Sequence, residues 1–293
     1  MKKLFRANLK SPYSAASAAF APDTSRSSAY RPTGLLACAR CVSEAKSPLS
    51  LRKRDFRLAL IALFLALPAA PASSADPFDG FAAKVTADNL KPFMRDLGFL
   101  LAADINHTGR SLGFSGFDLG MRDGVIPGPR SGDTVLSNTS VALPIVQAEI
   151  GMPFRLDGFI RGFDYQGFTM SGGGLKWGFT QLSDKPHAFR GMIYAAGHAG
   201  VHESFSVTSF SGGLVCSWQA DVLEPFVSAA YERTRLTVRL ASDAGLIGRE
   251  ATVYDPRVTV GLNIRPGQFV YMHAALSAVS SLMGFEYSLG VRF

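Results

Sequence analysis

Five histidines are the first residues in this 293-residue chain to consider for chemistry: His107, His187, His198, His202 and His273. None stands in an HExxH arrangement, and no His, Cys and Asp spacing is typical of zinc. His198 and His202 are four residues apart, so on a strand they would share one face about 13 Å apart, too far to hold one ion. The sequence therefore predicts no metal site and no cofactor.

A second set of polar residues consists of charged side chains that alternate with apolar ones. Its members are Asp118, Arg122, Glu149, Lys176, Glu232, Arg257, Arg265, Glu286 and Arg292. On the inward face of a closed sheet they could form the selectivity lining of a channel or an acid–base pair. They could equally be ion pairs that fill a narrow interior. We favour the ion pairs, because buried charges must be paired and the two signs nearly balance.

Signs of an enzyme are weak. His273 and Ser277 fall on one face of one segment and are the only hint of a base and a nucleophile. No GxSxG sequence occurs, and Gly172-Gly-Gly174 precedes a strand instead of opening a helix, so it does not predict a phosphate loop. We therefore expect no catalytic residues and no enzymatic activity.

The elements that must position these residues are strands. In Leu282–Phe293 the odd positions from Met283 onward are apolar, whereas the even positions include Glu286, Ser288 and Arg292. A two-faced segment of this length matches a tilted strand that crosses a membrane, about 9–11 residues. The same alternation predicts ten strands that start near residues 111, 141, 156, 169, 188, 204, 224, 254, 268 and 282.

The predicted fold class is all-β, an antiparallel transmembrane β-barrel of about ten strands (8–12). A secreted sandwich would also alternate, but its strands average about 5–6 residues. The polar face here mixes Gly, Ser and Thr with both charge signs, as a lumen does. Aromatic residues fall near strand ends, as girdles would: Tyr254, Trp218, Phe269 and Phe293.

Connections between these strands differ in length. Those at 123–140 and 241–253 are long and polar, and most others are short. Short turns at one end of a barrel and longer loops at the other are the bacterial arrangement. We therefore expect both ends of the mature chain at the periplasmic end.

One amphipathic helix is predicted before the first strand, over residues 86–101 with Asp88 as its N-cap. Its apolar stripe is Leu90, Phe93, Met94, Leu97 and Leu101. A lone helix this short is marginal in water, so the stripe needs a partner. Two placements remain open, a plug inside the lumen or a cover across the periplasmic mouth.

The N-terminal region predicts export. Residues 52–57 are basic, an apolar run follows from Leu58 to Leu67, and small residues lead to Ala75, as in a secretory signal peptide. We expect residues 1–50 to be an unstructured upstream segment from a misassigned start, and 51–75 the signal peptide. Residues 76–110 then form a periplasmic segment with the helix, and 111–293 the barrel.

Charge agrees with this division. Residues 1–75 carry 12 Lys and Arg against 3 Asp and Glu, a net +9, whereas residues 76–293 carry 18 against 20, a net −2. The basic excess of the chain, +7 in all, thus lies in the part that export removes. We expect no nucleic-acid partner.

The final strand resembles the C-terminal signature of bacterial outer-membrane barrels, through Phe285, Tyr287, Leu289, Val291 and Phe293. The segment from Leu97 to Met121 is similar to an uncharacterised family of outer-membrane proteins with an amphipathic helix before the first strand. This resemblance implies a Gram-negative outer membrane, lipid as surroundings, and recognition by the barrel-assembly machinery. It brings no catalytic residues.

Three functions stay open at this point. The first is a structural barrel or a narrow or gated passive channel for small solutes or apolar molecules. The second is a barrel-embedded enzyme that acts on lipid or surface peptides, and the third an adhesin that acts through loops 123–140 and 241–253. The sequence leaves the oligomeric state open.

Overall fold

The computed structural model describes residues 76–136, 140–182, 187–267 and 269–293. The predicted upstream segment 1–50 and the predicted signal peptide 51–75 lie outside these residues. Among the residues that are described, no helix is long and apolar enough to cross a membrane.

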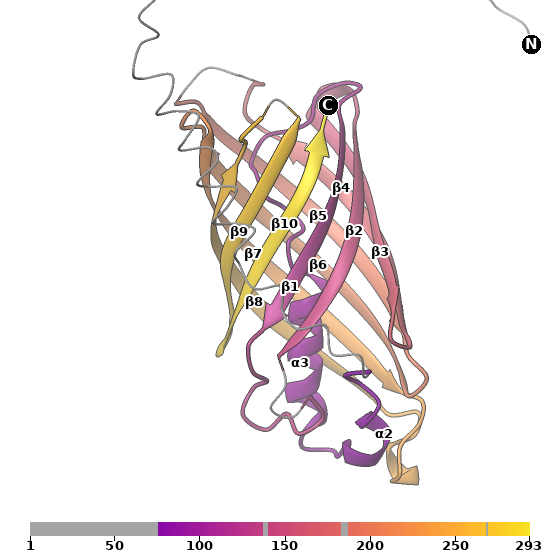
Figure 1. The fold of residues 1–293 in the computed structure, drawn as a ribbon. Coiled ribbons are helices and arrows are strands. Elements are labelled where there is room, and N and C mark those ends of the chain that lie inside the picture. The colour runs from indigo at the N-terminus through magenta and orange to yellow at the C-terminus, as the bar shows by residue number, and fades with distance from the viewer. Residues whose placement is uncertain (1–75, 137–139, 183–186, 268) are drawn as a thin grey trace, which may run out of the picture. The chain divides into compact units, whose positions relative to one another are not determined.

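Ten antiparallel strands form a closed barrel in which each strand pairs with its sequence neighbours and β1 pairs with β10 (Figure 1). The strands are β1 (Phe117–Ile126), β2 (Val141–Gly151), β3 (Leu156–Tyr165), β4 (Phe168–Gly178), β5 (Phe189–Val201), β6 (Phe205–Trp218), β7 (Leu223–Val238), β8 (Glu250–Ile264), β9 (Val270–Val279) and β10 (Leu282–Arg292). Closure leaves no unpaired sheet edge. The predicted fold class and strand number are confirmed.

The first strand begins at Phe117, six residues later than the alternation predicts. Residues 111–116 instead fold against the start of β3. The Ser111 hydroxyl and the Leu112 N–H both donate to the Asp157 carboxylate, and the Ser115 N–H donates to the Gly151 carbonyl. These bonds hold the segment inside the barrel end and keep it out of the sheet.

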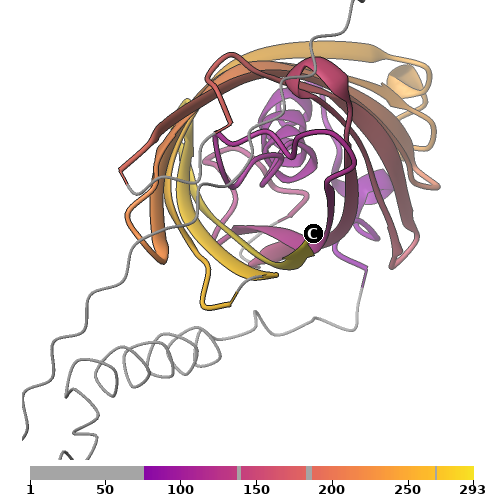
Figure 2. The same ribbon diagram turned by 90° about the horizontal axis from the view of Figure 1, so that it is seen from above.

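Two helices precede the barrel, α2 (Phe81–Lys84) and α3 (Leu90–Leu101), and α3 stands inside the ring of strands when the barrel is seen along its axis (Figure 2). The residue before α3 is Asn89 and not the predicted Asp88. Asn89 is preferred because its side chain accepts from the Thr86 N–H and donates to the Lys84 carbonyl, fixing the turn before the helix. We call residues 76–116 the plug and residues 102–116 the luminal segment.

The plug runs the length of the barrel before the first strand starts. Asp76 lies 2.9 Å from the Nε2 atom of His202, in the β5–β6 turn. The luminal segment leads into β1 at Phe117, which exchanges backbone hydrogen bonds with Phe293 at the opposite end of the barrel. The expectation that both ends of the mature chain lie at one end is therefore wrong for this structure, because the chain passes through the lumen first. Below, the two ends are the Phe293 end and the His202 end.

Connections at the His202 end include two long ones, residues 127–140 and 239–249, and three tight ones. At the Phe293 end they run over 152–155, 179–188, 219–222 and 265–269. Lengths therefore differ less between the ends than the sequence suggested. The long connections do lie opposite Phe293, as predicted.

The outer surface of the barrel is an apolar band with aromatic side chains at both margins. Trp177, Phe189, Trp218, Phe269 and Phe293 are exposed at the Phe293 end. Tyr231 and Tyr254 stack on each other toward the His202 end, with their ring centroids 6.2 Å apart. The exposed apolar side chains between the margins include Leu119, Met121, Val146, Ile150, Ile160, Leu175, Ile193, Leu214, Val227, Val258, Val260, Leu276, Met283, Phe285 and Leu289.

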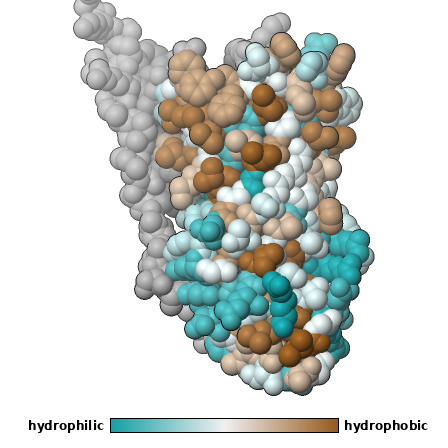
Figure 3. Space-filling view, turned by 90° about the vertical axis from the view of Figure 1, so that its right-hand side faces the viewer, coloured by the Kyte–Doolittle hydropathy of each residue, from teal (hydrophilic) through white to brown (hydrophobic). Residues whose placement is uncertain are grey.

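Beyond the two tyrosines, both faces of the wall change polarity. The outward positions become Arg233 and Arg235, and Arg235 pairs with Glu250 on the next strand. The inward positions of the same strand become Leu236 and Val238, both buried. Figure 3 shows brown apolar side chains over the upper part of one face and more teal hydrophilic ones over the lower part.

Candidate functional site

The candidate site is the lumen, which the plug fills from end to end. At the His202 end the inward side chains of the wall are apolar and form a cup around α3. The buried wall residues of this cup are Ile126, Val141, Leu143, Ile145, Phe168, Met170, Phe205, Val207, Leu236, Val238, Val253, Val279 and Leu282.

Phe93 lies at the centre of this cup and is fully buried. Its ring centroid lies 5.1 Å from that of Phe81, 5.4 Å from that of Phe205 and 6.1 Å from that of Phe78. The predicted stripe of α3, which includes Leu90, Met94, Leu97 and Leu101, is buried throughout. The helix therefore finds its partner in the barrel wall.

One ion pair ties α3 to the long connection after β1. Arg130 donates from its Nε atom to Asp96 at 2.8 Å, and its backbone N–H donates to the other carboxylate oxygen at 2.8 Å. Arg130 also donates to the Val279 carbonyl at 2.7 Å. Burial, which outweighs the attraction of Arg130, raises the pKa of Asp96 to about 7, and the nearby Asp133 carboxylate adds to the rise.

Toward the middle of the barrel the wall turns polar and holds the plug by its backbone. Arg257 lies between Glu232 at 2.5 Å and Glu286 at 2.6 Å, and donates to the Phe99 carbonyl at 2.7 Å. The guanidinium also lies 4.5 Å from the centroid of the Phe99 ring. A buried guanidinium is stable here because two carboxylates and a carbonyl surround it.

Arg122 is the centre of the next group and is fully buried. It pairs with Glu149 at 2.9 Å and with Asp118 at 3.4 Å, and donates to the Asp104 carbonyl at 3.2 Å. Lys176 pairs with Glu149 at 2.7 Å and donates to the Ile105 carbonyl at 2.8 Å. The carbonyls of the luminal segment, which would otherwise be unpaired in the lumen, thus receive charged donors from several strands.

The same segment contributes side chains of its own. The ring of His107 stacks on that of Tyr271 with centroids 4.1 Å apart. Asp104 lies 3.1 Å from His273, and the Thr108 hydroxyl lies 2.5 Å from Glu224. The plug is therefore joined to the wall along its whole path.

All nine charged residues that the alternation selects lie in the lumen or at its rim. Asp118, Arg122, Glu149, Lys176, Glu232, Arg257 and Glu286 are buried inside, whereas Arg265 and Arg292 lie at the Phe293 end. Four residues of the C-terminal signature, Phe285, Tyr287, Leu289 and Val291, alternate outward on β10, and the fifth, Phe293, follows the strand and is exposed.

His273 and Ser277 both point inward but do not meet as a base and a nucleophile. His273 contacts Asp104, whereas the Ser277 hydroxyl bonds to Thr259 and Glu286, both at 2.5 Å. In the part of the chain that is described, no group of three His, Cys, Asp or Glu side chains could hold a metal ion.

Several luminal residues escaped the sequence analysis: Asp104, His107, Arg161, Arg190 and Glu224. Arg161, Arg190 and Glu224 occupy inward positions, so strict counting of alternate positions could have found them. Asp104 and His107 belong to the luminal segment, and no periodic pattern marks its path.

Among the described residues, the plug leaves little space in the middle of the lumen. A cavity of about 10 Å³ beside Asp104 and Arg257 has room for about one water molecule. Barrels of about eight strands have interiors that side chains fill, and aqueous pores appear at 16–18. Here ten strands enclose a plug in addition to side chains, and the central charges of the described lumen form ion pairs with one another.

No protein-family model and no curated protein matches the chain. Among solved structures, the N-terminal β-barrel domain of Pseudomonas aeruginosa OprF is similar, with 11% identity over 62% of this chain and 99% of that chain and a TM-score of 0.33. The attachment invasion locus protein Ail of Yersinia pestis, in complex with the heparin analogue sucrose octasulfate, has 11% identity over 61% and 97% and a TM-score of 0.29. The KdgM porin has 9% identity over 60% and 98% and a TM-score of 0.29.

Proposed function

We propose that this chain is an integral barrel of a Gram-negative outer membrane, exported by its signal peptide. The apolar band between two aromatic margins supports this, because a lipid-facing surface requires that composition and a closed sheet pairs every backbone group. The predicted orientation has Phe293 at the periplasmic end and the long connections outside.

We further propose that the barrel is a closed, non-enzymatic one whose own plug seals it. It serves as a structural barrel, and conducts small solutes only when the plug withdraws. The observation that carries this proposal is that three plug carbonyls accept hydrogen bonds from charged side chains of the wall: Phe99 from Arg257, Asp104 from Arg122 and Ile105 from Lys176. A substrate pocket in the lumen would need space that these contacts occupy.

The test compares currents through planar bilayers for the intact chain and for Gly124→Leu. Gly124 points inward, and a side chain there would collide with the Cβ atom of Ala103 in the luminal segment. The matched control is Gly212→Leu, whose added Cβ meets only ordinary contact, 3.6 Å from the Tyr194 carbonyl, on the outer face. We expect no steady current for the intact chain or the control and stepwise currents for Gly124→Leu.

Each outcome separates one part of the proposal. Steady current through the intact barrel would show that the plug is not a seal. All three proteins could instead show no current while each still shifts on a gel between boiled and unboiled samples, as folded barrels do. That result would support a structural barrel and refute the proposed opening. Absence of that shift, with the protein soluble in the periplasm, would remove membrane insertion itself.

A further inference from the structure

The outer face of β6, β7 and β8 changes composition in three rows beyond the apolar band, toward the His202 end. The strand register sets the outward side chains of each row side by side. The rows are Phe210, Arg233 and Tyr254; then Thr208, Arg235 and Thr252; then Ser206, Thr237 and Glu250. We call these nine residues the arginine face. Aromatic rings lie nearest the apolar band, and hydroxyl groups lie farther out.

The first row joins exposed rings to a guanidinium. Phe210 and Tyr254 are 60% and 52% exposed, and the Arg233 guanidinium lies 5.8 Å from the centroid of the Tyr254 ring. Such a contact uses the face of the ring and leaves the N–H donors of the guanidinium for other acceptors. Aromatic margins lie at the level at which headgroups meet acyl chains. The arginine face therefore begins at the level of lipid headgroups.

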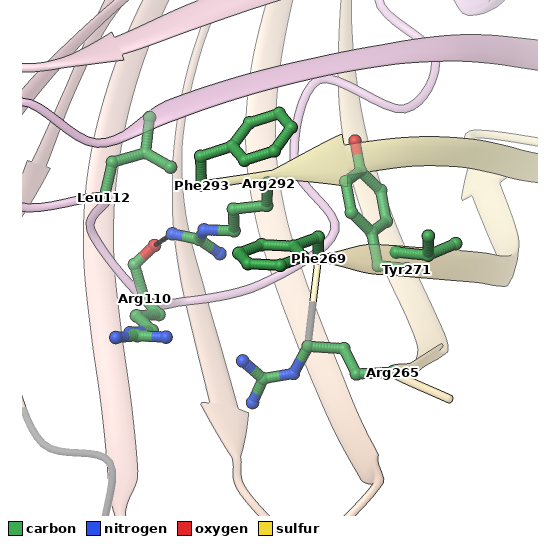
Figure 4. Close-up of a pocket in the computed structure, with 8 residues that line it drawn as sticks. Arg110, Leu112, Arg265, Phe269, Tyr271, Arg292 and Phe293 are labelled. Atoms are coloured by element: carbon green, nitrogen blue, oxygen red, sulfur yellow. Dashed lines mark hydrogen bonds between the residues drawn. The ribbon is translucent and has the colours of Figure 1, made fainter. Parts of the chain in front are cut away.

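Arginines at the opposite end of the barrel lie in a different setting. Figure 4 shows that Arg265 and Arg292 line a pocket of about 190 Å³ together with Arg110. Arg265 pairs with Glu224 at 3.4 Å, and Arg292 donates to the Arg110 carbonyl at 3.1 Å. Those side chains bond to the chain itself, whereas the arginine face lies on the outside of the wall.

Positive charge exceeds negative charge on and around the arginine face. Arg235 pairs with Glu250, the one acidic residue of the three rows, and Arg233 pairs with no carboxylate of the described chain. Arg239 and Arg249 are exposed directly beyond the ends of β7 and β8, and the connection between them adds one aspartate. Four guanidiniums thus lie near two carboxylates, so this surface attracts an anion.

We propose that the arginine face binds a phosphorylated glycolipid of the outer leaflet. A headgroup phosphate lies against Arg233 and Arg235, which are about 7 Å apart along β7. Sugar hydroxyls lie against Thr208 and Thr252, and acyl chains run along Phe210. Guanidinium groups match phosphate oxygens in geometry and charge, and basic residues near a membrane surface attract anionic lipids.

The rows favour a glycolipid over two other sources of phosphate. A phosphoglycerol lipid offers the same phosphate, but its small headgroup leaves the hydroxyl rows without a partner. Free phosphate offers nothing to the exposed rings. The proposal rests on the proposed membrane insertion and on the orientation that places the His202 end outside.

The experiment uses the folded exported chain in an uncharged detergent. Diphosphoryl lipid A, dephosphorylated lipid A, phosphatidylglycerol or inorganic phosphate is added. Bound lipid is counted by native mass spectrometry, and thermal unfolding is followed by the gel shift. We expect diphosphoryl lipid A to be retained at least tenfold more than its dephosphorylated form and several-fold more than phosphatidylglycerol. It should also raise the unfolding midpoint, and inorganic phosphate should not.

Four variants locate the binding. Arg233→Gln should lower retention of diphosphoryl lipid A at least fivefold, and adding Arg235→Gln should lower it at least tenfold. Thr208→Val combined with Thr252→Val, which keeps all charges, should lower retention of lipid A without changing that of phosphatidylglycerol. The matched control Lys91→Gln removes one exposed charge from α3 and should change nothing.

Equal retention of the two forms of lipid A, or a loss in Lys91→Gln as large as in Arg233→Gln, overturns the site. Phosphatidylglycerol retained as well as diphosphoryl lipid A, or an equal rise of the midpoint with inorganic phosphate, shows an anion site of another kind and also overturns the proposal. A protein that keeps its gel shift but shows no lipid preference refutes only this site. A protein without a gel shift refutes the membrane barrel.

Discussion

Replacing Phe93 with alanine should weaken the docking of the plug, and it changes no residue of the barrel wall. Phe93 is fully buried among Phe78, Phe81 and Phe205, and its removal leaves a cavity in a packed apolar cup. Such a truncation costs about 3–5 kcal/mol. Since about 1.4 kcal/mol is a factor of ten, the population with α3 undocked should rise roughly 100- to 4,000-fold.

Limited trypsin digestion measures that population through cleavage after Arg95. This bond lies within α3, so it is cut when the helix leaves the cup and unfolds, and the rate follows the undocked population when docking is fast. The matched control is Phe114→Ala, which removes a ring that is 76% exposed in the luminal segment. Cleavage and bilayer currents in Phe93→Ala that stay at the level of the intact chain, with the gel shift retained, would refute the cup as the anchor of the plug.

Three further predictions follow from the same contacts. Arg122→Met leaves Glu149 and Asp118 without this partner in the lumen and should lower the free energy of unfolding by about 3–5 kcal/mol, measured by urea titration of the gel shift. Arg122→Lys keeps the positive charge and should cost less, and equal costs for the two variants would contradict the role of that charge. Folding raises the pKa of Asp96 from 3.8 to about 7. The contribution of its protonated form to plug stability is therefore complete below about pH 4 and is lost as the pH rises through 7. Cleavage after Arg95 should become faster over that window, and Asp96→Asn, which leaves Arg130 and Asp133 in place, should remove this acceleration. An epitope placed before Asp76 should be stained on intact cells, whereas one after Phe293 should need permeabilisation; the reverse result would invert the proposed orientation.

The barrel could be predicted from the sequence because apolar and polar residues alternate along a strand whose two faces meet different environments. In β10 every second residue meets the lumen, and Glu286 and Arg292 could be placed inward from position alone. Where the polarity of the two faces reverses along one strand, the alternation of apolar and polar residues is harder to recognise. In β7 the inward face passes from Ser228 and Glu232 to Leu236, so no single rule describes the strand.

The path of the plug could not be predicted from the sequence, for a different reason. The helix could be predicted from its stripe, but its partner is assembled from strands distant in the chain, such as Phe168 and Phe205. The luminal segment has no periodicity, and it contacts the wall through backbone carbonyls, which every residue type has. Only the spatial arrangement shows which arginines meet them.

The order of elements along the plug matches the order of environments along the wall. The apolar helix α3 comes first and lies where the inward side chains are apolar, and the luminal segment follows where they are charged. Moving the plug toward Phe293 would bring the apolar stripe against Arg257 and Arg122 and leave those charges without the carbonyls that now accept from them. Moving it the other way would draw the carbonyls of Asp104 and Ile105 into the apolar cup. The reversal of polarity in the wall therefore fixes the depth of the plug, and any opening requires that α3 leave the cup as a unit.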